Sequence, residues 1–149
     1  MGALTAPRST PQYGGSPFGV LPETMSFTVS AGVTLYQGAL AVVSASTGTV
    51  QPMTSAGSLV VAGRCEAGNG GVSSFAAGVA ATIRQGAFLW NNGAGHLLAA
   101  ANFGTLCYGD NDNTVSTNSS SQSVAGIFLG IDPVSLYAIV LTTWGCQLL

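Results

Sequence analysis

The residues best suited to chemistry are Asp110 and Asp112, which form an Asp-x-Asp pattern in the stretch Leu106–Val115, LCYGDNDNTV. An EF-hand calcium loop that began at Asp110 would need glycine at its sixth position and glutamate at its twelfth. Those positions hold Val115 and Ser121, so the turn residue and the bidentate ligand are both missing. Asp and Asn side chains bond to the backbone two residues further on and tolerate left-handed dihedrals. The pattern therefore predicts a turn between strands, with adventitious calcium binding as the alternative.

His96 is the only histidine, and it stands in the turn-like sequence GAGHLL. A general base needs a partner within hydrogen-bond reach, and the sequence offers neither a nucleophile elbow of the form G-x-S-x-G nor any lysine for a phosphate-binding loop. Five acidic residues could supply a carboxylate pair for glycoside hydrolysis, but nothing in their context favours one. We therefore expect a chain that is not an enzyme, with no catalytic, cofactor-binding or metal-binding residues.

The remaining charged and thiol side chains have simpler interpretations. Arg64 and Glu66 stand two residues apart in a strand-like run and would share one face of the strand, which predicts a surface or interface ion pair. The cysteines, Cys65, Cys107 and Cys146, are far apart and form no zinc-binding pattern. We expect them to be small buried side chains with free thiols, as suits assembly in a cytoplasm.

Very few residues in the chain are charged. Charged residues make up 5% of the 149 residues, against roughly 25% in an average soluble domain, while apolar residues make up 47%. A surface without charge tends to associate or to be covered by other protein, which points to a component of an assembly. Three scattered arginines cannot neutralise a phosphate track, so nucleic acid is not an expected partner. No apolar run approaches the roughly 20 residues of a spanning helix and the N-terminus lacks a signal-peptide pattern, so no membrane association is expected.

Residues 1–23 differ in composition from the rest of the chain. They hold four of the six prolines together with a Gly-Gly pair, which favours extended backbone over packed structure. We predict an N-terminal arm that docks on a neighbouring protein, while a disordered tail remains the alternative. The residues expected at that interface are Pro7, Arg8, Pro11, Tyr13 and Phe18, with the two aromatic side chains as apolar anchors.

From residue 24 onward the sequence consists of short strand-like runs separated by turns. The runs recur every 8–12 residues or so, which is typical of a β-sandwich or β-barrel. Gly38 marks a bend, Pro52 favours an edge strand, and Asn69-Gly70 marks a turn. The only helical signal is one short turn over residues 97–102, closed by Gly104. The sequence thus predicts an all-β chain: a single domain over residues 24–149, built as a small barrel or sandwich of short antiparallel strands, preceded by the arm.

The order of several motifs resembles the capsid cement, or head decoration, proteins of tailed bacteriophages. The motifs are GTVQPM, VVAGRCEAG, ATIRQGAFLWNN, FGTLCYGDNDNTVS, SVAGIFLGID and LYAIVL, and together they span about residues 35–141. The matching positions are Arg84, Gly86, Phe88, Gly104, Cys107, Tyr108, Asp112, Thr114, Val115, Ser116, Ala125, Gly126 and Asp132, with Asp112 slightly shifted. Each motif alone is weak, and their order and spacing together carry the resemblance.

The resemblance implies a structural virion protein. Such a protein sits on the outer surface of the head, binds the major capsid protein and cements neighbouring capsid subunits against the pressure of the packaged DNA. It also implies self-association as trimers or dimers, with a homotrimer favoured, and assembly in the host cytoplasm. No cofactor is expected.

A carbohydrate-binding β module on a virion or cell surface is the alternative function. Trp90 stands beside Asn91 and Asn92, and an exposed tryptophan next to amide side chains can stack on a sugar ring. Tryptophan is more often part of a core, so the position of Trp90 in the fold decides how much weight this motif carries.

Overall fold

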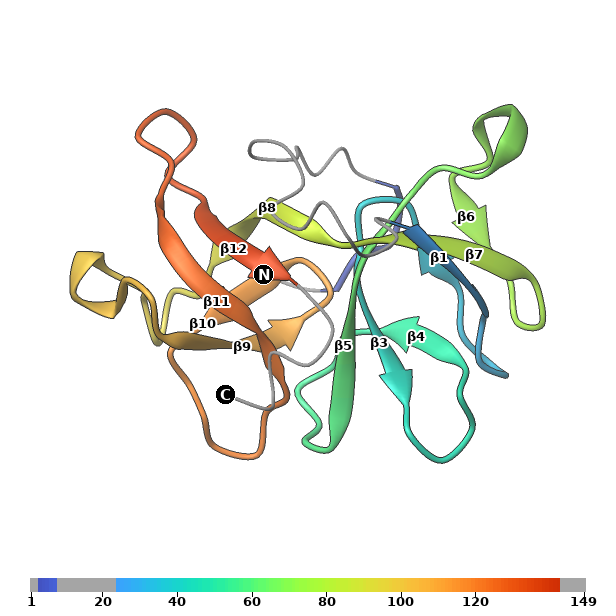
Figure 1. Cartoon of the computed structure of the whole chain (residues 1–149), viewed down its shortest axis with the longest axis horizontal. Helices are drawn as coiled ribbons and strands as arrows, with labels where there is room; N and C mark the ends of the chain where they lie inside the picture. The colour runs from blue at the N-terminus through green and yellow to red at the C-terminus, as the bar shows by residue number, and fades with distance from the viewer. Residues whose placement is uncertain (1–2, 8–23, 143–149) are drawn as a thin grey trace.

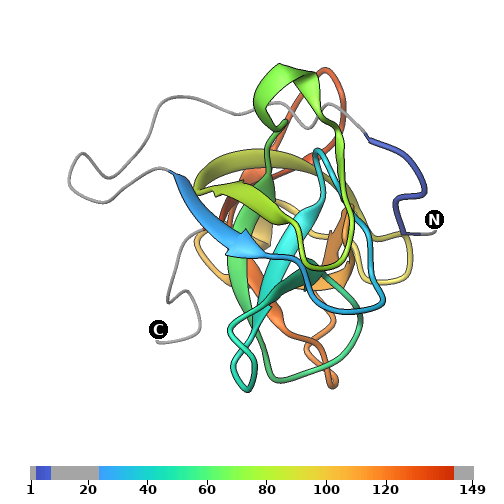
Figure 2. The ribbon, with the colours of Figure 1, turned by 90° about the vertical axis from the view of Figure 1, so that its right-hand side faces the viewer.

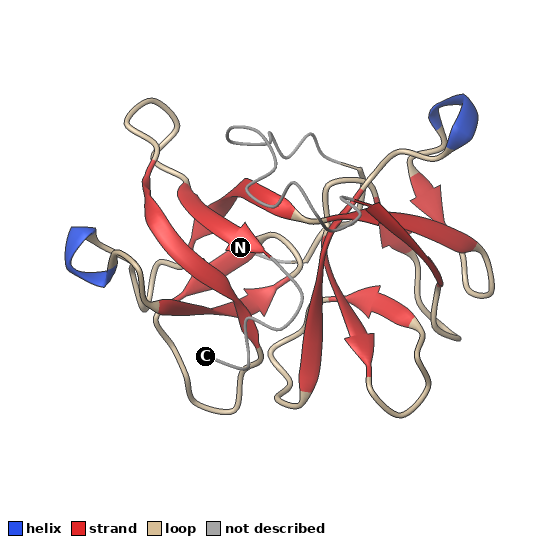
Figure 3. Ribbon diagram, viewed as in Figure 1, coloured by secondary structure: helices blue, strands red, loops and turns tan. Residues whose placement is uncertain are grey.

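The computed structural model describes residues 3–7 and 24–142, and these form an almost entirely β-stranded protein (Figures 1 and 3). The helices among the described residues are two single 3-10 turns, η1 (Asn69–Gly71) and η2 (Ala100–Asn102), so none has the length of a membrane-crossing helix. The described strands are β1 (Thr24–Thr28), β2 (Leu35–Tyr36), β3 (Leu40–Ser44), β4 (Val50–Pro52), β5 (Leu59–Cys65), β6 (Ser74–Phe75), β7 (Ala80–Arg84), β8 (Gly86–Asn92), β9 (Leu106–Asn111), β10 (Thr114–Ser116), β11 (Val124–Ile131) and β12 (Ala138–Thr142). The all-β prediction is confirmed.

One half of the molecule is an open sheet of five antiparallel strands in the order β1-β7-β5-β3-β4. Pro52 lies in β4, at the edge of this sheet, as predicted, because proline has no N–H to donate to a further strand. Gly38 lies between β2 and β3 with a φ of 85°, a left-handed conformation that bends the chain there. The short strands β2 and β6 pair with each other beside the sheet.

The other half is a closed barrel of five strands in the order β10-β8-β12-β11-β9, seen on the left in Figure 1. The barrel closes because β10 pairs antiparallel with β9 and parallel with β8. This β8–β10 pairing is the one exception to the antiparallel arrangement among the named strand pairs. Only Gln85 separates β7 from β8, so the chain passes directly from the sheet into the barrel.

The sheet and the barrel share a hydrophobic core. Strand β3 alternates, so that Leu40 and Val42 face the barrel while Ala39 and Ala41 belong to a second cluster on the opposite side. The shared cluster comprises Leu40, Val42, Met53, Leu59, Val61, Phe88, Trp90, Leu98, Cys107, Val115, Ala125, Phe128, Ala138 and Val140. Both halves contribute to it, so neither buries this apolar surface without the other.

Candidate functional site

The turn predicted in the Asp-x-Asp stretch is present: Asp110 and Asn111 end β9, and Asp112 and Asn113 form the turn that leads into β10. The side-chain oxygen Oδ1 of Asn111 accepts a hydrogen bond of 3.0 Å from the backbone N–H of Asn113, two residues on. Unlike most turns of Asp and Asn, this one is buried: the exposed fraction of Asp112 is 1%. The local sequence predicts the turn, but it carries no signal for what covers the turn.

The buried turn joins segments that are distant in the sequence. The carbonyl oxygen of Asp112 accepts a 2.7 Å hydrogen bond from Leu40 of β3, and that of Asn113 accepts a 3.0 Å bond from Asn91 of β8. The Asp112 carboxyl atom Oδ1 accepts a 2.7 Å bond from the backbone N–H of Leu4. The turn therefore ties together the sheet, the barrel and the N-terminal residues.

Asp110 belongs to a separate hydrogen-bond network, which is formed by strands and a loop of the barrel half. Its Oδ1 atom accepts bonds from the Ser116 hydroxyl at 2.7 Å and from the Gln122 amide at 2.9 Å. The two aspartates are thus held by different partners and do not form a joint site. Within residues 3–7 and 24–142, no three His, Cys, Asp or Glu side chains gather where they could hold a metal ion.

His96 lies exposed on the loop that follows β8, and this loop is fixed through its backbone. The carbonyl oxygen of His96 accepts a 2.9 Å bond from the N–H of Thr117. The Ser116 hydroxyl, next in sequence to Thr117, is fully buried and donates its hydrogen bond to Asp110.

The ion pair predicted between Arg64 and Glu66 is present. The Nε atom of Arg64 donates a 2.8 Å bond to Oε1 of Glu66, and Nε of Arg84, directly opposite Arg64 on β7, lies 3.7 Å from the same oxygen. The Arg64 guanidinium carbon also lies 4.5 Å from the ring centre of Phe88 in the barrel. Glu66 thus stands between two cations that would otherwise repel each other, at the junction of sheet and barrel.

The cysteine prediction is confirmed for the two cysteines that the structure describes. Cys65 and Cys107 are buried free thiols, and Cys146 lies outside the described residues. Burial, reinforced by the charge of Glu66 and opposed by that of Arg64, raises the pKa of Cys65 to about 12. The thiol therefore stays protonated and unreactive near neutral pH.

The motif behind the carbohydrate alternative does not face solvent. Trp90 is fully buried in the shared core, because alternate residues of β8 point into the barrel. Its ring packs edge-on against the ring of Phe88, with the two ring centres 6.3 Å apart. The amide of Asn91 bonds Asn113, and that of Asn92 makes two 2.9 Å bonds with the backbone of Leu98. The interpretation of these residues as a sugar-stacking site is therefore wrong: they fix the barrel and its neighbouring loop.

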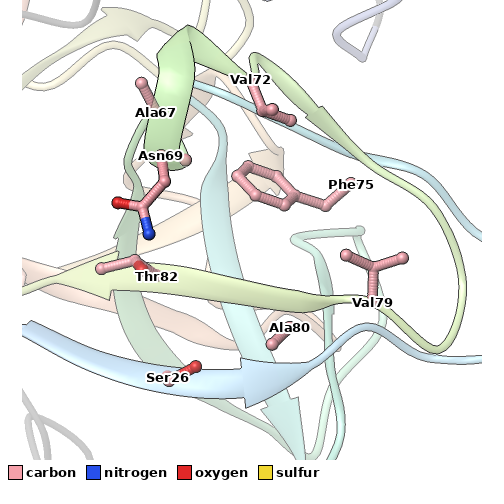
Figure 4. Close-up of a pocket in the computed structure, with 9 residues that line it drawn as sticks. Ser26, Ala67, Asn69, Val72, Phe75, Val79, Ala80 and Thr82 are labelled. Carbon is pink, nitrogen blue, oxygen red and sulfur yellow. The ribbon is translucent and has the colours of Figure 1, made fainter.

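A shallow groove of about 380 Å³ lies beside η1, between that turn and the strands β1 and β7 (Figure 4). Phe75 lies at its centre in the figure, while the Asn69 amide points across the opening toward Thr82. The residues around it are Ser26, Ala67, Gly68, Asn69, Val72, Phe75, Val79, Ala80 and Thr82, none of them charged. The Phe75 ring is itself buried, so the groove offers little aromatic surface for stacking.

The most exposed of the large apolar side chains lie in two loops of the barrel. The exposed fractions are 90% for Val134 and 68% for Leu136 in the β11–β12 turn, and 67% for Phe103 and 60% for Leu97 around η2. Such side chains occur singly on many proteins, but here they gather in two loops on a surface with almost no charge. Sequence reasoning did not single them out, because it placed the docking residues in the arm.

Hydrogen bonds from Asp132 constrain the backbone of the β11–β12 turn. The Oδ2 atom of Asp132 accepts bonds from the N–H of Ser135 at 2.7 Å and from its hydroxyl at 2.6 Å. These bonds also lower the pKa of Asp132 below its ordinary value of 3.8. Leu136 has a φ of 61°, a left-handed conformation that costs a non-glycine residue about 1–2 kcal/mol. Leu136 is 68% exposed, so it contributes little to the core that could offset this strain.

Of the interface residues predicted in the arm, Pro7 is described and is exposed, while Arg8, Pro11, Tyr13 and Phe18 lie outside the described residues. The described part of the arm, residues 3–7, contacts the chain's own domain through Leu4. Comparison with protein-family models, with curated proteins and with solved structures found no significant match.

Proposed function

We propose that this chain is a head decoration protein of a tailed bacteriophage, which binds the outer surface of the capsid and cements neighbouring major capsid subunits. The observation that carries the proposal is the strained β11–β12 turn, which presents Val134 and Leu136 to solvent beside a single carboxylate, Asp132, that is already hydrogen-bonded within the turn. Apolar tips on a rigid β scaffold suit insertion between larger proteins. The resemblance of the motif order to head decoration proteins is what leads us to propose major capsid subunits as these larger proteins.

The mechanism is one of binding alone. A protein that binds the intact shell, and not its separated subunits, stabilises the shell by mass action, by about 4 kcal/mol per site at a thousandfold excess over the dissociation constant. Self-association, which we propose to be a trimer in preference to a dimer, would add multivalent attachment across several capsid subunits. None of these steps requires a reacting group.

The test is binding to capsids that lack this protein. We expect the purified chain to cosediment with such heads and to appear as added density on their outer surface. Leu136→Asp should weaken binding at least about tenfold, because the contact would then bury an unpaired charge. Ala45→Asp adds the same charge to the exposed β3–β4 turn in the other half and serves as the matched control.

Two results would refute the proposal. One is a wild-type chain that binds no head lattice at saturating concentration. The other is density found only on the inner surface of the shell. If Leu136→Asp and Ala45→Asp bind equally well, the protein would still be a decoration protein, but the β11–β12 turn would not be its contact.

A further inference from the structure

Residues 3–7, here called the strap, occupy a defined site on the folded domain, here called the seat. The seat consists of the Asp112 carboxyl group and the apolar cluster on the outer side of β3, against which the Leu4 side chain packs. That cluster includes Val29, Leu35, Ala41 and Ile83. The strap is thus recognised in two ways, through one backbone N–H and through one apolar side chain.

The seat exists independently of the strap's covalent connection. Every seat residue belongs to the domain that begins at β1, and Asp112 is held from the other side by its own backbone bond to Leu40. Figure 2 shows residues 3–7 on the opposite side of the ribbon from the start of β1 at Thr24. The strap therefore does not extend the first strand; it binds as a separate element.

The length of the connection allows the strap to reach another molecule. Sixteen residues, 8–23, join Pro7 to Thr24, and a chain of that length spans at most about 55 Å when fully extended. One strap confined within that radius corresponds to an effective concentration of a few millimolar, roughly. A neighbouring copy fixed a few tens of ångströms away on a shell would present its strap at a similar concentration. Exchange leaves every strap–seat contact unchanged, so little free energy opposes it.

We propose that the strap is exchangeable, and that the seat of one copy can be filled by the strap of a second copy. In dilute solution each strap occupies its own seat. On the crowded shell, straps pass between neighbouring copies and link them into a network. This link on the shell rests on the proposed function, whereas the capacity of the seat to bind a strap from another molecule does not.

The first experiment uses the full chain carrying Leu4→Asp, which disables its own strap, and a synthetic peptide of residues 1–7 labelled at its C-terminus. We expect saturable binding of one peptide per chain in fluorescence polarisation, and a higher melting temperature in the presence of the peptide. A peptide N-methylated at Leu4 keeps the side chain but lacks the N–H, and it should bind about tenfold or more weakly. No binding, or equal binding of both peptides, would overturn the proposed seat.

The second experiment tests exchange between whole chains. The Leu4→Asp chain offers a vacant seat, and an Asp112→Ala chain offers a strap whose own seat is impaired. Mixing the two chains should give a complex whose mass, measured by light scattering, exceeds that of either chain alone. The unlabelled 1–7 peptide should dissociate this complex, because it competes for the seat. The double variant Leu4→Asp/Asp112→Ala is the control and should not pair with Asp112→Ala.

The outcomes separate the two proposals. If the mixed chains show no added mass while the peptide binds, the strap is confined to its own chain and exchange is wrong. If Asp112→Ala does not fold, an otherwise wild-type chain that carries Ala3→Cys labelled with a donor or an acceptor dye replaces it. Donor-labelled and acceptor-labelled chains are then mixed at high protein concentration. Energy transfer between them that the 1–7 peptide abolishes would support exchange, and a mixture without energy transfer would refute exchange. None of these measurements requires a capsid, so they test strap exchange even if the chain proves not to bind capsids.

Discussion

Each acidic side chain in the described part of the chain accepts hydrogen bonds from the protein itself. Asp110 and Asp112 bind different segments, Asp132 closes a turn, and Glu66 binds arginine. This explains why an Asp-x-Asp pattern yields a structural turn and not a metal site. The turn was predictable because Asp and Asn favour such backbone locally. Its burial was not, because burial depends on the distant residues Leu40 and Leu4.

Ser135→Ala should raise the pKa of Asp132 toward 3.8, because the hydroxyl that stabilises the ionised carboxylate is removed. The pKa in the folded chain is lowered, so ionised Asp132 stabilises the turn at pH values above 3.8. That contribution is lost as the pH falls through the lowered pKa. An NMR titration of the Asp132 side-chain carbon measures the change. Ser119→Ala, in a different loop, should leave the titration unaltered, and a Ser135→Ala curve identical to wild type would contradict the assignment.

Most strands were predictable as elements, although their partners were not. The short strand-like runs of the sequence include stretches that form β3, β5 and β9, and the helical signal over residues 97–102 corresponds to η2. The motif ATIRQGAFLWNN reads in the sequence as one strand-like stretch. In the structure it covers most of β7 and all of β8, which enter two different sheets. The parallel pairing that closes the barrel also escaped prediction, because strand partners are set by long-range packing and not by local periodicity.

Gly63→Ala should destabilise the fold by about 2–4 kcal/mol, since it combines backbone strain with a steric clash. Gly63 has a φ of 144°, and a Cβ atom there would lie 2.2 Å from the carbonyl oxygen of Arg84 on β7. Chemical denaturation monitored by circular dichroism measures the loss. The matched control is Gly95→Ala, where an added Cβ meets no atom within 4 Å and the stability should barely change. Equal stabilities for the two variants would show that β5 and β7 can separate at little cost.

The sheet and the barrel look like two bodies in the ribbon, yet their shared core predicts that they unfold as one. Phe88 and Phe128 of the barrel belong to the same cluster as Val42 and Val61 of the sheet. Arg64 reinforces the junction by stacking on Phe88, and the Ser123 hydroxyl accepts a 3.0 Å bond from the N–H of Leu59. Loss of either half would expose this surface to water, so partial unfolding is costly.

We therefore expect a single cooperative transition. Far-ultraviolet circular dichroism follows the strands of both halves, while differential scanning calorimetry follows the total heat. The two should give one midpoint, and the van't Hoff and calorimetric enthalpies should agree. Two resolved heat peaks would instead show that sheet and barrel are independent domains. Phe128→Ala, which opens a cavity in the shared cluster, should lower the midpoint without splitting the transition, at a cost of about 3–5 kcal/mol.

Closure of the barrel through β8 and β10 affects how the chain behaves at high local concentration, where fibrils can form. A ring of strands has no open edge, and an open edge is where separate polypeptides stack into fibrils. On the other half, the edge strand β4 contains Pro52, which interrupts the donor row that such stacking needs. In a charge-poor chain held at very high local density, fibril growth along the barrel and along β4 is thereby disfavoured, which leaves β1, at the other edge of the described sheet, as the strand open to such stacking.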